Sequence, residues 1–112
     1  MPVDFPIATK RLKATWSDGS AHDVLIEIGR PYPDGNSFRC KVRASGLQQD
    51  YSPPDLAGAD EMQALTLSLR FVRFLLEWHL EAGGRLFYPA PDDHMPYTPH
   101  DLPTTDDEDA AS

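Results

Sequence analysis

The chain has 112 residues, 40% of them hydrophobic, which is enough for one folded domain with a core of modest size. No apolar run approaches the roughly 18 residues of a membrane span, and the first residues lack the apolar stretch of a secretory signal. A single cysteine, Cys40, excludes an internal disulfide and fits a reducing compartment. We therefore expect a cytoplasmic protein with no membrane partner.

The formal net charge of −8 is distributed unevenly along the chain. Residues 92–112 hold seven acids and no Lys or Arg, which leaves 11 acids against 10 bases in residues 1–91. The seven acids are Asp92, Asp93, Asp101, Asp106, Asp107, Glu108 and Asp109. An acidic, proline-rich composition of this kind is typical of disorder. The sequence predicts a single domain over residues 1–90 and a disordered acidic tail over residues 91–112.

Alternating apolar residues mark three segments of the domain, each with one apolar and one polar side. The apolar positions are Ala8, Leu12, Ala14 and Trp16, then Val24, Ile26 and Ile28, then Phe38, Cys40, Val42 and Ala44. This pattern predicts an antiparallel three-stranded meander with one buried and one solvent-facing side.

The first turn predicts the register of the first two strands. A three-residue loop over residues 17–19 puts Gly19 at the left-handed position that such loops require. It pairs Leu12 with Val24, Ala8 with Ile28, and Lys13 with Asp23. A two-residue loop would shift the pairing by one residue and mix the buried and solvent-facing sides.

The second turn is predicted to be wider, over residues 31–36, because its two prolines break the second strand. The expected pairs are Ile28 with Phe38, Glu27 with Arg39, and Asp23 with Arg43. Basic side chains on the polar side of the sheet are then paired, and the nearly neutral body lacks the basic excess of a phosphate-binding surface. We therefore expect no nucleic-acid partner.

A long helix follows, with a clear start and end. Asp60 is the expected N-cap, Gln63 completes a capping box, and Gly83-Gly84 ends the helix after Ala82. The preceding segment, residues 47–59, contains Pro53-Pro54 and no periodicity, so we expect a loop. Residues 85–88 are predicted to return to the sheet as a short fourth strand at an edge. The predicted fold class is α+β, with the meander packed on one long C-terminal helix.

The helix carries two apolar stripes where one sheet face can cover only one. The first comprises Met62, Leu65, Leu69, Val72, Leu76 and Leu80, and the second Ala64, Leu67, Phe71, Phe74 and Trp78. Three partners could bury the second stripe: the chain's own residues 45–59 and 85–88, a second copy of the chain, or another protein. The candidate interaction residues are Leu67, Phe71, Phe74 and Trp78.

Other candidate chemistry is sparse. Asp92, Asp93 and His94 could join His100 and Asp101 at a metal, but a proline-rich disordered backbone would not preorganise them, so no metal is expected. Cys40 fits a small core hydrophobe. No phosphate loop, Cys-x-x-Cys or Gly-x-Ser-x-Gly occurs, so we expect no catalytic residue and no cofactor. His79 lies beside the first stripe of the helix, where a packing or boundary role is favoured. A ligand site between residues 45–59 and the helix would use Tyr51, His79 and Tyr88.

Several short motifs are spread over residues 7–88: Ile7-Ala8-Thr9, Ile28-Gly29-Arg30-Pro31, Phe38-Arg39-Cys40, Gln63-Ala64-Leu65 and the Gly84-x-Leu86 ending. Together they resemble an uncharacterised bacterial family of small domains of unknown function. Pro53-Pro54 ahead of the helix departs from that pattern, which bears on the conformation of the loop. The resemblance implies a β-β-β-α arrangement and a bacterial source, and it implies no activity.

The sequence does not assign a biochemical activity. The leading interpretation is a non-catalytic protein-interaction domain, of the immunity or adaptor kind, that uses the second stripe to bind a protein partner or a second copy. The alternative is a small-ligand-binding protein or an enzyme with its site between residues 45–59 and the helix.

Overall fold

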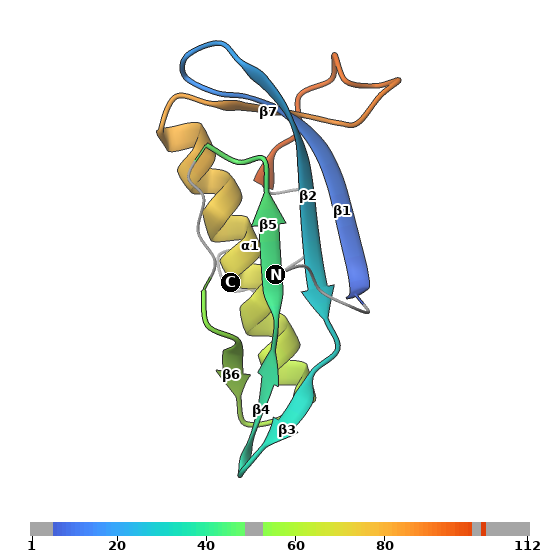
Figure 1. Cartoon of the computed structure of the whole chain (residues 1–112), viewed down its shortest axis with the longest axis vertical. Coiled ribbons are helices and arrows are strands. Elements are labelled where there is room, and N and C mark those ends of the chain that lie inside the picture. The colour runs from blue at the N-terminus through green and yellow to red at the C-terminus, as the bar shows by residue number, and fades with distance from the viewer. Residues whose placement is uncertain (1–5, 49–52, 100–101, 103–112) are drawn as a thin grey trace, which may run out of the picture.

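The computed structural model describes residues 6–48, 53–99 and 102. One helix packs against antiparallel sheets, which confirms the α+β class (Figure 1). The elements are β1 (Pro6–Thr15), β2 (Ala21–Gly29), β3 (Tyr32–Asp34), β4 (Ser37–Cys40), β5 (Val42–Ser45), β6 (Leu56–Gly58), α1 (Glu61–Glu81) and β7 (Arg85–Phe87). They form a four-stranded sheet of order β5-β2-β1-β7 and a three-stranded sheet of order β3-β4-β6.

The first hairpin has the predicted register. Leu12 pairs with Val24, Ala8 with Ile28, and Lys13 with Asp23. The backbone N–H of Trp16 donates to the carbonyl of Ser20 at 2.9 Å, so the loop holds three residues. Gly19 has a φ of 87°, the left-handed conformation that closes this loop.

The predicted pairing of the second and third strands is wrong. Ile28 lies opposite Val42, and Glu27 lies opposite Arg43. The chain turns tightly at residues 35–36, and the residues expected in the wide turn form β3, which pairs with β4. Proline is tolerated in β3 because this strand lies at the edge of its sheet. The predicted third strand is therefore divided at Lys41, with β5 in one sheet and β4 in the other.

The segment expected to be a loop contributes a strand. Residues 56–58 form β6, which pairs with β4 through Phe38↔Gly58, Arg39↔Ala57 and Cys40↔Leu56. Three residues are too few for alternation to be recognised, and Pro53-Pro54 just before them indicates a loop. Both sheets lie beside α1, and the three-stranded sheet covers its N-terminal part (Figure 1).

The helix begins and ends as predicted. The side chain of Asp60 accepts a hydrogen bond from the Gln63 N–H at 2.7 Å. The Gln63 amide accepts one in return from the N–H of Ala59. At the other end, the Gly83 N–H donates to the carbonyl of Leu80 and the Gly84 N–H to that of His79, the two bonds of a Schellman motif.

The buried line of the helix runs between the two predicted stripes. Ala64, Ser68, Val72, Leu75, Leu76 and His79 are buried against the sheets. Met62 and Leu80, both assigned to the first stripe, are 75% and 36% exposed. The Ser68 hydroxyl donates to the Ala64 carbonyl at 2.8 Å, which satisfies its polar group inside the core.

The segment after the helix belongs to the folded body. β7 pairs with residues 13–15 of β1 at the sheet edge, as expected. Beyond it, the Tyr97 N–H donates to the Leu86 carbonyl at 2.9 Å, and Tyr97 and Leu102 are buried. Residues 91–99, the first part of the segment predicted as a tail, thus include a side chain that packs into the core. Residues 100–101 and 103–112 lie outside the described residues.

The N-cap gives a first prediction. Asp60→Ala leaves the Gln63 N–H without its capping acceptor and should lower the free energy of unfolding by about 0.5–2 kcal/mol in urea denaturation. Glu61→Ala is the matched control, because Glu61 lies in the same turn and carries the same charge without capping. Equal losses in the two variants would argue against the cap.

Candidate functional site

Four side chains form an apolar face on the outside of α1, which we call the helix aromatic face: Leu67, Phe71, Phe74 and Trp78. Leu67 and Phe71 are half-buried, whereas Phe74 is 53% and Trp78 36% exposed. The ring centroids of Phe71 and Phe74 lie 6.3 Å apart, and those of Phe74 and Trp78 lie 5.5 Å apart. The rings form a contiguous surface in the range of favourable aromatic contacts.

The helix itself dictates this placement. Spacings of three and four residues put the four side chains on one side of an α-helix, next to the buried line through Ser68 and Leu75. Phe71 also packs against the core cluster, which anchors one edge of the face. The outward residues Phe74 and Trp78 remain accessible because neither sheet reaches around the helix to them.

A polar strip borders the helix aromatic face on the side away from the sheets. Arg70 and Glu77 are seven residues apart and so lie on the same side of the helix, one at each end of the strip. Glu81 adds a second carboxylate one turn beyond Glu77. The strip is therefore positive at Arg70 and negative at Glu77 and Glu81, and Glu77 also forms an ion pair with Arg73 of its own helix at 3.9 Å.

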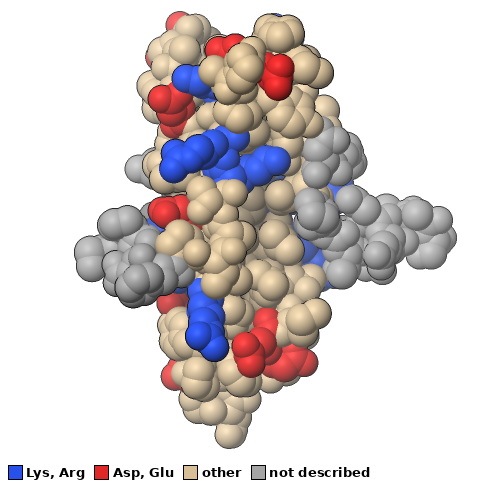
Figure 2. Space-filling view, turned by 90° about the vertical axis from the view of Figure 1, so that its right-hand side faces the viewer, with Lys and Arg blue, Asp and Glu red and all other residues tan. Residues whose placement is uncertain are grey.

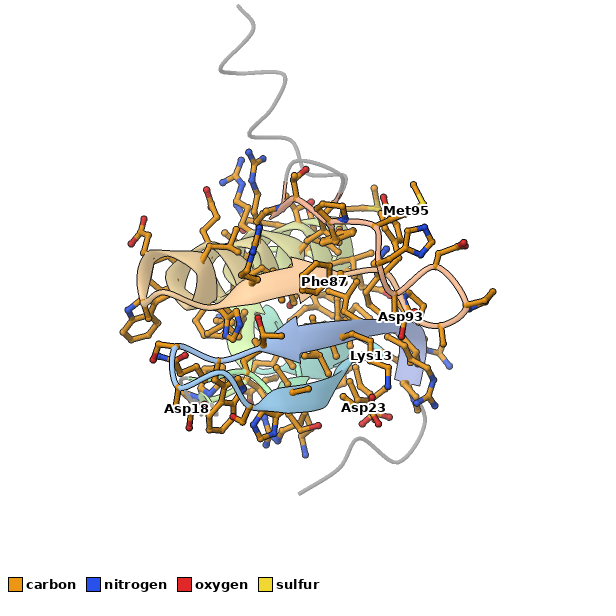
Figure 3. All side chains as sticks on the ribbon, turned by 90° about the horizontal axis from the view of Figure 1, so that it is seen from above. Lys13, Asp18, Asp23, Phe87, Asp93 and Met95 are labelled. Carbon is orange, nitrogen blue, oxygen red and sulfur yellow. The ribbon has the colours of Figure 1, made fainter. Side chains whose placement is uncertain are left out.

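Several basic side chains of the sheets are paired with acids. Lys13 forms an ion pair with Asp23, and this hydrogen bond and charge raise the pKa of Lys13 and lower that of Asp23. Figure 3 shows Lys13 between Asp23 and Asp93. Arg39 pairs with Asp34 within the smaller sheet instead of with Glu27. On the β1 side of the molecule, Figure 2 shows basic side chains across the middle with acidic ones above and below.

His79 of the predicted ligand site is a structural residue. Its ring is fully buried. Its Nδ1 accepts a hydrogen bond from the Gln48 N–H at 3.0 Å, so Nε2 carries the proton and donates to the Thr15 carbonyl at 3.1 Å. A Cβ on Gly84 would lie 2.3 Å from Nε2, so only glycine fits against the ring. Burial lowers the pKa of His79 and favours the neutral imidazole.

The structure does not bring the other two residues of the predicted ligand site to His79. Tyr88 packs edge-on against Tyr97, with ring centroids 5.3 Å apart, next to the end of β7. Tyr51 is outside the described residues. His79 bonds to Gln48 and Thr15, whereas Tyr88 packs on Tyr97. The two side chains therefore have different partners and do not face one common site.

The tip of the first hairpin brings together three polar residues that the sequence does not single out as a group. Ser20 Oγ lies 2.6 Å from Asp18 Oδ1 and 2.8 Å from His22 Nε2. A catalytic serine needs a histidine that accepts its proton and is oriented by an acid. Here the serine lies between the acid and the histidine, and Asp18 also accepts from the Ser20 N–H, as in an Asx turn. The cluster stabilises the turn.

The thiol of Cys40 is part of the hydrophobic core. Cys40 is fully buried, burial raises the pKa of its thiol, and its Sγ donates to the Gly29 carbonyl at 3.1 Å. Among the described residues no group of three or more His, Cys, Asp and Glu side chains is placed to hold a metal ion. No described helix is both long and apolar enough to cross a membrane.

The burial of His79 predicts a pH dependence of stability. The unfolded chain binds a proton near pH 6.5, whereas the folded chain stays neutral to lower pH, so stability is lost as pH falls below about 6.5. Each unit by which the pKa is lowered corresponds to about 1.4 kcal/mol. His79→Gln should be less stable at pH 7.5 and lose less between pH 7 and 5 in urea denaturation. A His79→Gln variant that keeps the wild-type slope between pH 7 and 5 would contradict this account.

Comparison with known proteins gives one match. Neither the curated proteins nor the solved structures yield a match to the chain. Residues 8–97 match a family described as a domain of unknown function, DUF6968, and this range includes every strand from β2 to β7, the helix and all but the first two residues of β1. The match extends to Tyr97, consistent with the packed segment that follows β7. The chain therefore belongs to the DUF6968 family.

Proposed function

We propose that this domain is a non-catalytic interaction module that associates with a second copy of itself through the helix aromatic face. The observation that carries the proposal is the exposure of Phe74 and Trp78 in one contiguous group of rings. Large aromatic side chains that cluster on a surface are enriched at the centres of protein interfaces. The buried thiol of Cys40 suits a reducing compartment such as the cytoplasm.

The charges beside the face favour a second copy as the partner. In an antiparallel pair of helices with the two-fold axis near Phe74, Arg70 lies about 6 Å from the axis along the helix and Glu77 about 4.5 Å on the other side. The two-fold axis brings the same flank of both helices together. Arg70 of each copy then faces Glu77 of the other, while the rings pack between the helices.

The size of the face sets the expected strength. A stable complex typically buries about 800 Å² on each partner. A face built on two accessible rings, with two more apolar side chains already half-buried in their own domain, provides less than that. We therefore expect a reversible dimer that is populated at high protein concentration.

The apolar contact can be tested by introducing a charge. Phe74→Glu places a carboxylate at the centre of the face and should abolish the dimer in analytical ultracentrifugation over a wide concentration range. Met62→Glu is the matched control, because Met62 lies on the same helix, is 75% exposed and is outside the face. A wild-type chain that remains monomeric at the highest concentration would overturn the proposal.

The antiparallel arrangement can be tested by charge reversal. Arg70→Glu and Glu77→Arg should each weaken self-association, because each places like charges opposite one another in the dimer. A mixture of the two variants restores both opposite-charge pairs and should form a heterodimer, and the double variant should self-associate again. If the mixture associates no better than either variant alone, the arrangement is wrong, whatever the result for Phe74→Glu.

A further inference from the structure

The outer edge of β1 is only partly covered by another strand. β1 extends over Pro6–Thr15, yet β7 pairs with residues 13–15 alone. No described strand continues along residues 7–11 on that side. Since Trp16 is hydrogen-bonded to Ser20 across the hairpin, the even-numbered residues of β1 bond to β2, and the N–H and C=O groups of Thr9 and Arg11 point to the open edge.

An apolar groove adjoins this open edge. Its volume is about 130 Å³, and it lies between β1, β2 and α1. Ile26 and Ile28 form its floor, Leu69 and Val72 form the helix side, and Ala8 and Lys10 form the edge side. Ala8 faces the same side of the sheet as buried Leu12, yet it is exposed. At this end of β1 the described elements do not fully cover the space between the strand and the helix.

One side chain from outside the family domain occupies part of the groove. Leu102 lines it and is only 7% exposed, whereas the family match ends at residue 97. The sequence that follows Leu102 is Pro-Thr-Thr and then the acidic run Asp106–Asp109. Lys10 and Arg11 supply positive charge at the edge, where Lys10 Nζ also lies 4.7 Å from the centroid of the Tyr97 ring.

We propose that the open edge of β1 and this groove bind an extended peptide from a partner protein, with an apolar side chain in the groove and acidic residues after it, and that Leu102 competes for the same place. The peptide backbone would pair with Thr9 and Arg11 as an added strand, and the groove would select the side chain between them. This surface lies on the opposite side of α1 from the helix aromatic face, so it is a separate function from self-association.

The test uses the full chain and a fluorescein-labelled peptide with the sequence of residues 98–112. Leu102→Asp removes the competing side chain, so that variant should bind the peptide at least tenfold more tightly than the wild type in fluorescence anisotropy. A peptide that carries aspartate in place of its leucine should not bind. If the variant binds neither peptide at millimolar concentration, or binds both equally, the groove is not a peptide site.

Strand addition has its own controls. Thr9→Pro removes one N–H at the open edge without removing a bond to β2, and it should reduce peptide binding at least tenfold, whereas Thr9→Ala should not. A peptide N-methylated on the residue before its leucine tests the same pairing on an unaltered fold and should also lose at least tenfold; the residue after the leucine is a proline, which has no N–H to block. Unchanged affinity of the N-methylated peptide would overturn strand addition. Phe74→Glu should leave peptide binding unchanged, which separates this surface from the dimer.

Discussion

The fold depends on one buried imidazole. His79 joins the end of α1 to two other segments, because one ring nitrogen accepts from the Gln48 N–H after β5 and the other donates to the Thr15 carbonyl at the end of β1. Gly84 closes against the ring. These contacts hold the C-terminal end of the helix against the four-stranded sheet, while the short strand β6 contacts its N-terminal part. Because both ends of the helix are held, its rotation about its own axis is fixed. This rotation determines which of its side chains face outward.

The parts of the fold that follow local rules could be predicted from the sequence. Gly19 determined the first hairpin, and Asp60 with Gln63 determined the start of the helix, since turns and caps depend on a few neighbouring residues. The second sheet could not be predicted, because β3 and β6 are three residues long and adjoin prolines. β3 pairs with β4 across the tight turn at residues 35–36, whereas the pairing of β6 with β4 is a long-range choice that alternation within one segment does not reveal.

For the candidate sites, too, features set by local spacing could be predicted from the sequence, whereas features set by distant contacts could not. Phe74 and Trp78 could be placed on an outer face because helical spacing alone separates them from the core. The packing role of His79 was expected, but its partners could not be foreseen, because they are backbone groups distant in the sequence. The burial of Ser68 could not be foreseen either, since it is polar and is satisfied by a carbonyl in its own preceding turn. The groove beside β1 arises where three elements diverge, so no local pattern marks it. The two proposed surfaces lie on opposite sides of one helix, so a partner on one need not hinder the other.

Leu102 has a consequence for how the domain behaves when it is shortened. A chain that ended at the family boundary would retain every strand and the helix but would lack the side chain that fills the groove beside β1. Unpaired backbone groups next to an apolar hollow are the arrangement through which sheet edges associate with one another. Leu102 thus shields this hollow, and we expect a chain that ends at Tyr97 to associate edge to edge more readily than the full chain.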